Sequence, residues 1–207
     1  MLLRQADKTV RCVLRYKVGS FLVSQAMVMS AVIDDDTLQA QAQALGRYLQ
    51  QQHLSLVTAE SCSGGWIAKL VTDIAGSSAY VMGSVVSYTN RIKETLVGVQ
   101  HETLLAHGAV SEETAREMAE GIRRAIETDI GVGITGIAGP GGGTKEKPVG
   151  LVFIAVSGPR GTMVKENHFS GTRTEVKRQT TDTALAMAST YLTQLNHPEQ
   201  NAHPERK

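Results

Sequence analysis

Aromatic residues are scarce in this chain. Phe, Tyr and Trp together make up 4% of its 207 residues, so a packed core has to be built from Ala, Val, Ile, Leu and Met. The charge is nearly balanced, at +1, and gives no bulk electrostatic basis for binding nucleic acid. Hydrophobic residues nevertheless reach 42% and charged residues 20%. These proportions are typical of a packed globular protein, and the length suits one domain.

Cysteine is almost absent. Cys12 and Cys62 are the only two, which excludes a disulfide-rich scaffold and a cysteine-based metal site. The six histidines are scattered, with no His-x-x-x-His pair, so no metal site is expected. A reducing, cytoplasmic location is the simplest interpretation. Cys62 remains a candidate nucleophile, although buried inert cysteines are common.

Long apolar runs are also missing. Residues 1–30 carry dispersed basic residues followed by a mildly apolar stretch that serines dilute. This stretch is too polar for a membrane span, and the basic part is long for a signal peptide, which stays the alternative. We expect an N-terminal extension over 1–30, a single domain over 31–195 and a polar tail over 196–207, with no membrane association.

Helical and strand-like segments alternate along most of the domain. Apolar periodicity and capping residues predict helices over 34–51, 63–74, 91–97, 111–128 and 174–195, and short strands over 54–58, 80–87, 129–135, 151–157 and 162–170. This alternation predicts a three-layer α/β/α sandwich with a mostly parallel, mixed sheet and one antiparallel hairpin. Ligands of such sheets bind outside the carboxyl ends of the strands. The loops "ESCSGG", "SYTNRIK" and "TGIAGPGGG" are all predicted at that edge.

The first loop, "ESCSGG", places Ser61 where a strand ends and a helix begins. Free N–H groups at a helix start favour anions and would stabilise an oxyanion. The alternative is structural, because serine is also a favoured helix cap. The motif alone favours the cap.

The second loop, "SYTNRIK", places Lys93 five residues after Tyr88. A lysine with a lowered pKa can activate a serine, with a tyrosine helping to transfer or orient the proton. The alternative is a solvated lysine and a tyrosine at the edge of the core. Tyr and Lys also occur together in short-chain dehydrogenases, but the spacing differs here and no Gly-x-Gly-x-x-Gly opens the first strand–helix unit, which excludes that class.

The third loop, "TGIAGPGGGTKEKPVG", offers many backbone N–H groups, the Thr135 hydroxyl, Lys145 and Lys147. This combination can cradle a phosphate. It is not a Walker loop, because the chain contains no Gly-Lys-Ser/Thr. The alternative is a surface connection, although the loop is long for that role.

Taken together, "TAESCSGGWIAKLVTDIAGSS", "VVSYTNRIKETLVGV", "HGAVSEETAREMA" and "GITGIAGPGGGTKEKPVGLVFIAV" resemble the C-terminal domain of the CinA family. The stand-alone form of that domain is a nicotinamide-nucleotide amidase. The resemblance implies hydrolysis of nicotinamide mononucleotide to nicotinic acid mononucleotide and ammonia, without a cofactor, by a homodimer. It assigns the nucleophile to Ser61, and its activation to Lys93 with Tyr88.

Substrate contacts are expected along the same three loops, with ribose or phosphate held by the third. The expected substrate-binding residues are Glu60, Ser63, Gly64, Gly65, Asn90, Thr135, Gly136, Gly139 and Gly141. Ser63 and Thr89 depart from the usual family pattern but keep a hydroxyl. Two other functions stay open: a non-catalytic pyridine-nucleotide-binding module, and a DNA-related accessory suggested by the basic segment 173–178. The balanced charge gives the latter no support.

Overall fold

The computed structural model describes residues 33–195; the expected N-terminal extension and polar tail lie outside them. Five strands form one sheet in the order β2-β1-β3-β4-β5. They are β1 (Leu56–Glu60), β2 (Val81–Val86), β3 (Ile130–Gly136), β4 (Leu151–Gly158) and β5 (Gly161–His168). β1 pairs in parallel with β2 and β3, whereas β4 is antiparallel to both of its neighbours. The predicted mixed sheet is therefore confirmed, with β4 alone running against the other four.

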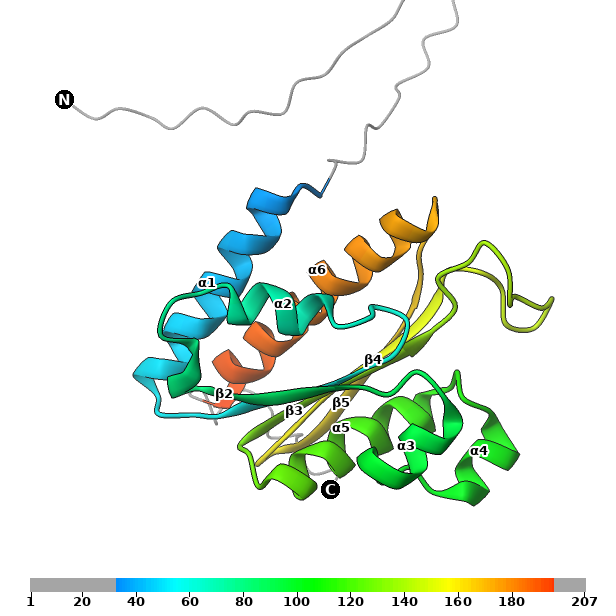
Figure 1. The fold of residues 1–207 in the computed structure, drawn as a ribbon, viewed down its shortest axis with the longest axis horizontal. Helices are drawn as coiled ribbons and strands as arrows, with labels where there is room; N and C mark the ends of the chain where they lie inside the picture. Colours follow the sequence, from blue (N-terminus) through cyan, green and yellow to red (C-terminus); the bar gives the residue numbers. More distant parts are fainter. Residues whose placement is uncertain (1–32, 196–207) are drawn as a thin grey trace, which may run out of the picture. The chain divides into compact units, whose positions relative to one another are not determined.

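Helices cover both faces of the sheet (Figure 1). One face carries α1 (Asp35–Gln51), α2 (Trp66–Thr72) and α6 (Arg173–Leu195). The other carries α3 (Asn90–Val97), α4 (His101–His107) and α5 (Glu112–Ile126). A short 3-10 helix, η1 (Ser77–Ala79), precedes β2. This is the three-layer α/β/α sandwich that the sequence predicts.

The core is aliphatic, as the scarcity of aromatic residues requires. β4 is buried along its whole length, which fits a strand covered by helices on both faces. The α5 helix presents Ala115, Met118, Ala119 and Ile122 to the sheet. Gly131 and Gly133 let α5 pack closely, because a Cβ at either glycine would meet Ala119 or Ala115 backbone oxygen within 2.4 Å.

Most predicted elements are confirmed, with shifted ends. The first strand starts at Leu56 rather than 54, because the N–H of Leu54 still bonds to Leu49 at the end of α1. The α4 helix is not predicted from the sequence. It has seven residues and buries only Leu104, so it leaves no apolar periodicity to detect. No helix within residues 33–195 combines the length and apolar character needed to cross a bilayer.

Candidate active site

The three loops predicted to form a site lie at one edge of the sheet. β1, β2 and β3 are parallel and end at Glu60, Val86 and Gly136. The loops that follow enclose a cleft of about 250 Å³. Of the expected site residues, the cleft is lined by Ser61, Tyr88, Lys93, Thr135, Gly136, Gly139 and Gly141.

Ser61 and Lys93 are in direct contact. The Lys93 Nζ lies 3.0 Å from the Ser61 Oγ and donates a 2.6 Å hydrogen bond to the backbone carbonyl of Ser87. The α3 helix holds this lysine in place, with the Thr89 hydroxyl capping its first turn. The Ser87 carbonyl fixes the orientation of the Lys93 nitrogen and leaves it facing the hydroxyl.

The surroundings of Lys93 favour the neutral amine. Lys93 is 1% exposed, and burial lowers its pKa from 10.5 to about 8. No carboxylate within residues 33–195 forms an ion pair with it. A neutral lysine has a free lone pair and can accept a proton from Ser61, so this pair has the geometry and the proton affinity of a nucleophile and its base.

Cys62 lies beside the pair but is a poor nucleophile. It is 6% exposed, and burial raises its pKa to about 12. Since the thiolate is the reactive form of cysteine, this thiol stays protonated and unreactive near neutral pH. The structure therefore favours Ser61 over Cys62.

Tyr88 lies at the mouth of the cleft. It is 63% exposed, and its hydroxyl accepts a 3.3 Å hydrogen bond from Arg173. In the described part of the chain, no hydrogen bond joins Tyr88 to Ser61 or Lys93. Arg173 also donates to the Gly139 carbonyl at 2.8 Å, so it links the mouth of the cleft to the glycine-rich loop.

Glu60 lies beneath the nucleophile rather than in the cleft. Its buried carboxylate accepts hydrogen bonds from the backbone N–H groups of Ile67 and Ala68 and from the Ser63 hydroxyl. A carboxylate at this place satisfies donors that a helix start leaves unpaired. Glu60 and Ser63, both expected to touch substrate, are 0% exposed and join the Ser61 turn to α2.

The turn after Ser61 differs from the expectation. The helix begins at Trp66 rather than at residue 63, because Gly64 and Gly65 adopt positive φ values of 70° and 85°. Gly64 bonds to the Ser61 carbonyl, and the N–H groups of Ile67 and Ala68 are taken by Glu60. The oxyanion donors expected at this helix start are therefore not available from these three groups.

Three further expected contacts lie away from the cleft wall. Asn90 is exposed as the first residue of α3, Gly65 packs towards the Val86 side chain, and Gly64 is exposed in the turn before α2. None of them lines the cleft. As contacts with substrate, all three stay predictions.

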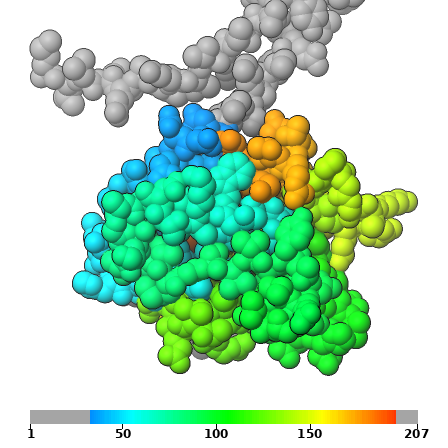
Figure 2. Space-filling model, viewed as in Figure 1, coloured from blue at the N-terminus to red at the C-terminus, as the bar shows by residue number. Residues whose placement is uncertain are grey.

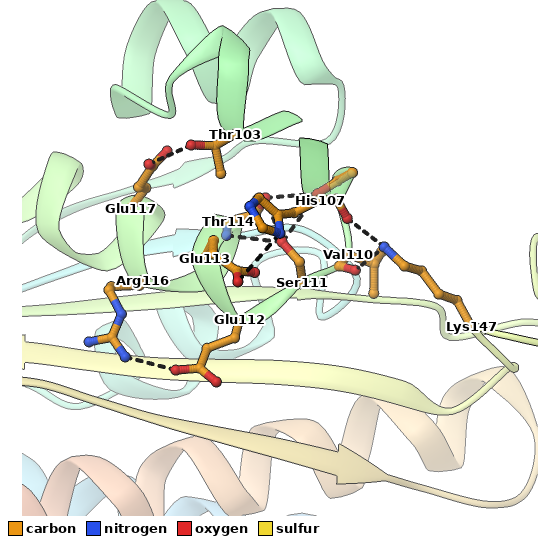
Figure 3. A network of polar contacts seen from close by, with 11 residues as sticks. Thr103, His107, Val110, Ser111, Glu112, Glu113, Thr114, Arg116, Glu117 and Lys147 are labelled. Carbon is orange, nitrogen blue, oxygen red and sulfur yellow. Dashed lines mark hydrogen bonds and ion pairs between the residues drawn. The ribbon is translucent and has the colours of Figure 1, made fainter. Parts of the chain in front are cut away.

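Residues of the third loop line the cleft, and the loop projects from the rest of the domain as the yellow-green segment of Figure 2. At its base, the Thr135 hydroxyl donates to the Ala109 carbonyl. Lys147 points away from the cleft, where its ammonium binds the carbonyls of His107 and Val110 (Figure 3). The phosphate cradle expected from both lysines of this loop is thus wrong for Lys147.

The sequence reasoning missed three residues of the cleft: Ala109, Val110 and Arg173. The first two belong to the connection between α4 and α5. Because α4 is not predicted from the sequence, this connection is not expected at the site either. Arg173 belongs to the basic segment 173–178, which the sequence connects only with a DNA-related role. Only the packing of α6 against the glycine-rich loop reveals its place.

The site offers a nucleophile, a base and a cation, but no metal ligands. Within residues 33–195, no three His, Cys, Asp or Glu side chains gather so that they could hold a metal ion. The chemistry that this arrangement supports directly is nucleophilic attack by serine, assisted by a neutral lysine.

The fold and the site together define a class: a three-layer α/β/α protein with a buried serine–lysine pair at the carboxyl edge of its sheet. The CinA C-terminal domain family matches residues 38–192. The chain belongs to this family.

Curated relatives are similar over the same region. A "Nicotinamide-nucleotide amidohydrolase PncC" from Escherichia coli (strain K12) is 47% identical over 152 residues, which cover 73% of this chain and 92% of that protein. A "CinA-like protein" from Syntrophus aciditrophicus is 47% identical over 168 residues, which cover 81% of this chain. The chain spans only 39% of that longer relative, and 36% of another from Moorella thermoacetica.

Solved structures agree with this assignment. The competence/damage inducible protein CihA from Agrobacterium tumefaciens has a TM-score of 0.73 and 43% sequence identity, over 76% of this chain and 96% of that one. The described domain thus corresponds to nearly the whole of that structure.

Proposed function

We propose that this protein is an amidohydrolase that converts nicotinamide mononucleotide to nicotinic acid mononucleotide and ammonia. The observation that carries the proposal is the 3.0 Å contact between Ser61 Oγ and a buried Lys93 whose pKa is lowered to about 8. The amidohydrolase name of the Escherichia coli relative supports the nature of the substrate. A module that only bound the nucleotide would have no need for a desolvated lysine against a serine.

The reaction starts from the neutral lysine. Ser61 Oγ attacks the carboxamide carbon as Lys93 takes its proton, and a tetrahedral intermediate forms. The C–N bond then breaks, and Lys93 returns the proton to the departing nitrogen, which leaves as ammonia. The product of this half-reaction is an ester between Ser61 and the pyridine carboxyl group.

Water completes the reaction. Lys93, neutral again, removes a proton from a water molecule that attacks the ester carbonyl. The ester bond breaks, the proton passes back to Ser61 Oγ, and the acid product is released. No oxidant, reductant or cofactor is needed to balance either half.

The cleft walls bind the remainder of the nucleotide. Arg173 provides a fixed positive charge at the mouth, and a guanidinium suits phosphate. Tyr88 lies beside it and orders the mouth, and the Thr135–Gly141 segment contacts the ribose. Glu60 and Ser63 hold Ser61 in position from below.

Ammonia release from nicotinamide mononucleotide without added metal tests this function. We expect wild type to release ammonia and Ser61→Ala and Lys93→Ala to lose most of the activity, by about a thousandfold or more for residues that act as one unit. Cys62→Ala, the matched neighbour, should stay within about twofold of wild type, because its thiol is protonated. If wild type binds the nucleotide without releasing ammonia, the protein is a binding module and the proposal is wrong.

A further inference from the structure

We propose that Lys147 is a positioning residue that ties the glycine-rich loop (residues 137–150) to the corner between α4 and α5 (residues 107–110), and so sets the position of two segments that line the cleft. This inference rests on the proposed function for its effect on substrate. Lys147 touches neither Ser61 nor Lys93, and it acts only through the backbone that it binds.

The corner depends on side chains for its hydrogen bonds. Its four consecutive carbonyls, from His107 to Val110, all accept bonds from side chains. Lys147 binds the first at 2.6 Å and the last at 2.7 Å (Figure 3). The other two are bound by Thr114 with Ser111, and by Thr135. These four carbonyls are not paired within a sheet or a helix, so the conformation of the corner depends on the side chains that bind them.

A cation suits this place for an electrostatic reason. His107 is the last residue of α4, so its carbonyl is one of the unpaired acceptors at the partially negative end of the helix. The Lys147 ammonium has three donors and can bind two carbonyls at once. Gly108 makes room for it, since a Cβ there would lie 3.2 Å from Nζ.

The loop side of the contact is equally defined. Lys147 belongs to a turn in which its N–H bonds to the Thr144 hydroxyl and its carbonyl accepts from the Thr144 N–H. The loop is closed at its base by bonds from Gly150 to Ile137 and from Ile137 to Leu151. Between this base and the tip of the loop, the Lys147 ammonium is the side-chain group that connects the loop to the corner.

Both tied segments line the cleft. Ala109 and Val110 line it from the corner, whereas Gly139, Gly141 and Gly142 line it from the loop. Release of Lys147 would let the loop wall move while Ser61 and Lys93 stay in contact. The expected cost therefore falls on substrate binding more than on the chemical step.

Lys147→Met tests this proposal, because it keeps the side-chain length and removes the donors. Lys165→Met is the matched control, since Lys165 is exposed on β5 outside the cleft lining and its side chain forms no hydrogen bond within residues 33–195. We expect Lys147→Met to raise KM for nicotinamide mononucleotide by about tenfold with kcat changed by less than about threefold, the scale of a small misplacement of binding groups. Amide exchange in residues 107–110 and 138–149 of the unliganded protein should also rise. Lys147→Arg should restore much of KM and protection.

Equal KM and equal amide exchange in Lys147→Met and Lys165→Met would overturn the proposal. Faster exchange with unchanged KM would overturn it too, because the contact would then be structural only. If wild type releases no ammonia, the proposed function fails separately, and the Kd of the nucleotide replaces KM in the same comparison. Should Lys147→Met fail to fold, Lys147→Gln takes its place, and a KM and amide exchange equal to those of Lys165→Met would then overturn the proposal.

Discussion

At the scale of single residues, the proposed chemistry depends on Lys93 being buried without a counter-charge. Desolvation disfavours the ammonium, and the pKa of about 8 puts a useful fraction of neutral amine at physiological pH. The same burial makes Cys62 inert by raising its pKa. One apolar environment thus activates the lysine and silences the thiol next to the serine.

The pH dependence of kcat/KM should follow Lys93. Below pH 8 the base is mostly protonated, so the rate should rise about tenfold for each pH unit and level off above pH 8. A stopped ammonia assay from pH 6 to pH 9.5 measures this profile, with circular dichroism to confirm folding throughout. A rate that falls as pH rises from 6 to 8 would contradict a neutral lysine base.

Replacing Lys93 by Met should stabilise the fold while abolishing activity. A lysine with a pKa of 10.5 when unfolded and about 8 when folded binds fewer protons in the folded state, so folding is penalised below pH 8 and the penalty fades as pH rises to 10.5. The penalty at pH 7 is about 3 kcal/mol, partly offset by the bonds to Ser61 and Ser87. We expect Lys93→Met to raise the free energy of unfolding by about 1–2 kcal/mol at pH 7, a gain that shrinks towards pH 10. Urea unfolding at both pH values checks this, and a loss of stability at pH 7 would count against the buried, unpaired ammonium.

At the scale of helices and strands, the sequence predicted the alternation and the edge at which the loops meet. The sequence is a poorer guide to the ends of helices and to contacts between distant side chains, because tertiary packing determines both. Gly64 and Gly65 have positive φ values, so α2 begins only at Trp66. The α4 helix is too short to show apolar periodicity. The contact between Ser61 and Lys93, 32 residues apart, could be expected only from the family resemblance. Arg173 and the role of Lys147 depend on how α6 and the third loop pack, which no local pattern encodes.

Glu60 should matter both for stability and for activity, because it links α2 to the Ser61 turn. Glu60→Ala leaves the buried N–H group of Ile67, the part-buried N–H group of Ala68 and the Ser63 hydroxyl without their acceptor, at a cost of about 1–3 kcal/mol for an unsatisfied buried group. The matched control is Glu117→Ala, whose carboxylate likewise holds the start of α4 through Gln100 and Thr103. Unfolding and ammonia assays should show both variants destabilised but only Glu60→Ala losing activity, by about tenfold or more. Equal activity in the two variants would show that Glu60 does not position Ser61.

At the scale of the whole molecule, all of the site residues named here lie between Glu60 and Arg173, inside the family match over 38–192. Both segments flanking 33–195 lie outside this match. The homodimer implied by the family resemblance stays a prediction, which sedimentation velocity of the full chain tests.

Removal of residues 1–30 should leave the enzyme intact. The contacts described for the cleft all join residues between Glu60 and Arg173, so we expect kcat, KM and the unfolding temperature to stay within error of the full chain. Ammonia release and thermal unfolding of both proteins provide the comparison. A large loss of activity with an unchanged unfolding temperature would mean that the segment contributes to the site.

The most direct test of the account is to trap the covalent intermediate on Ser61. Wild type mixed with nicotinamide mononucleotide and quenched in acid should carry an adduct of the substrate mass less ammonia on the peptide that contains Ser61, and Ser61→Ala should carry none. Peptide mass spectrometry distinguishes Ser61 from its neighbour Cys62. An adduct on Cys62, or full ammonia release by Ser61→Ala, would contradict the serine–lysine mechanism.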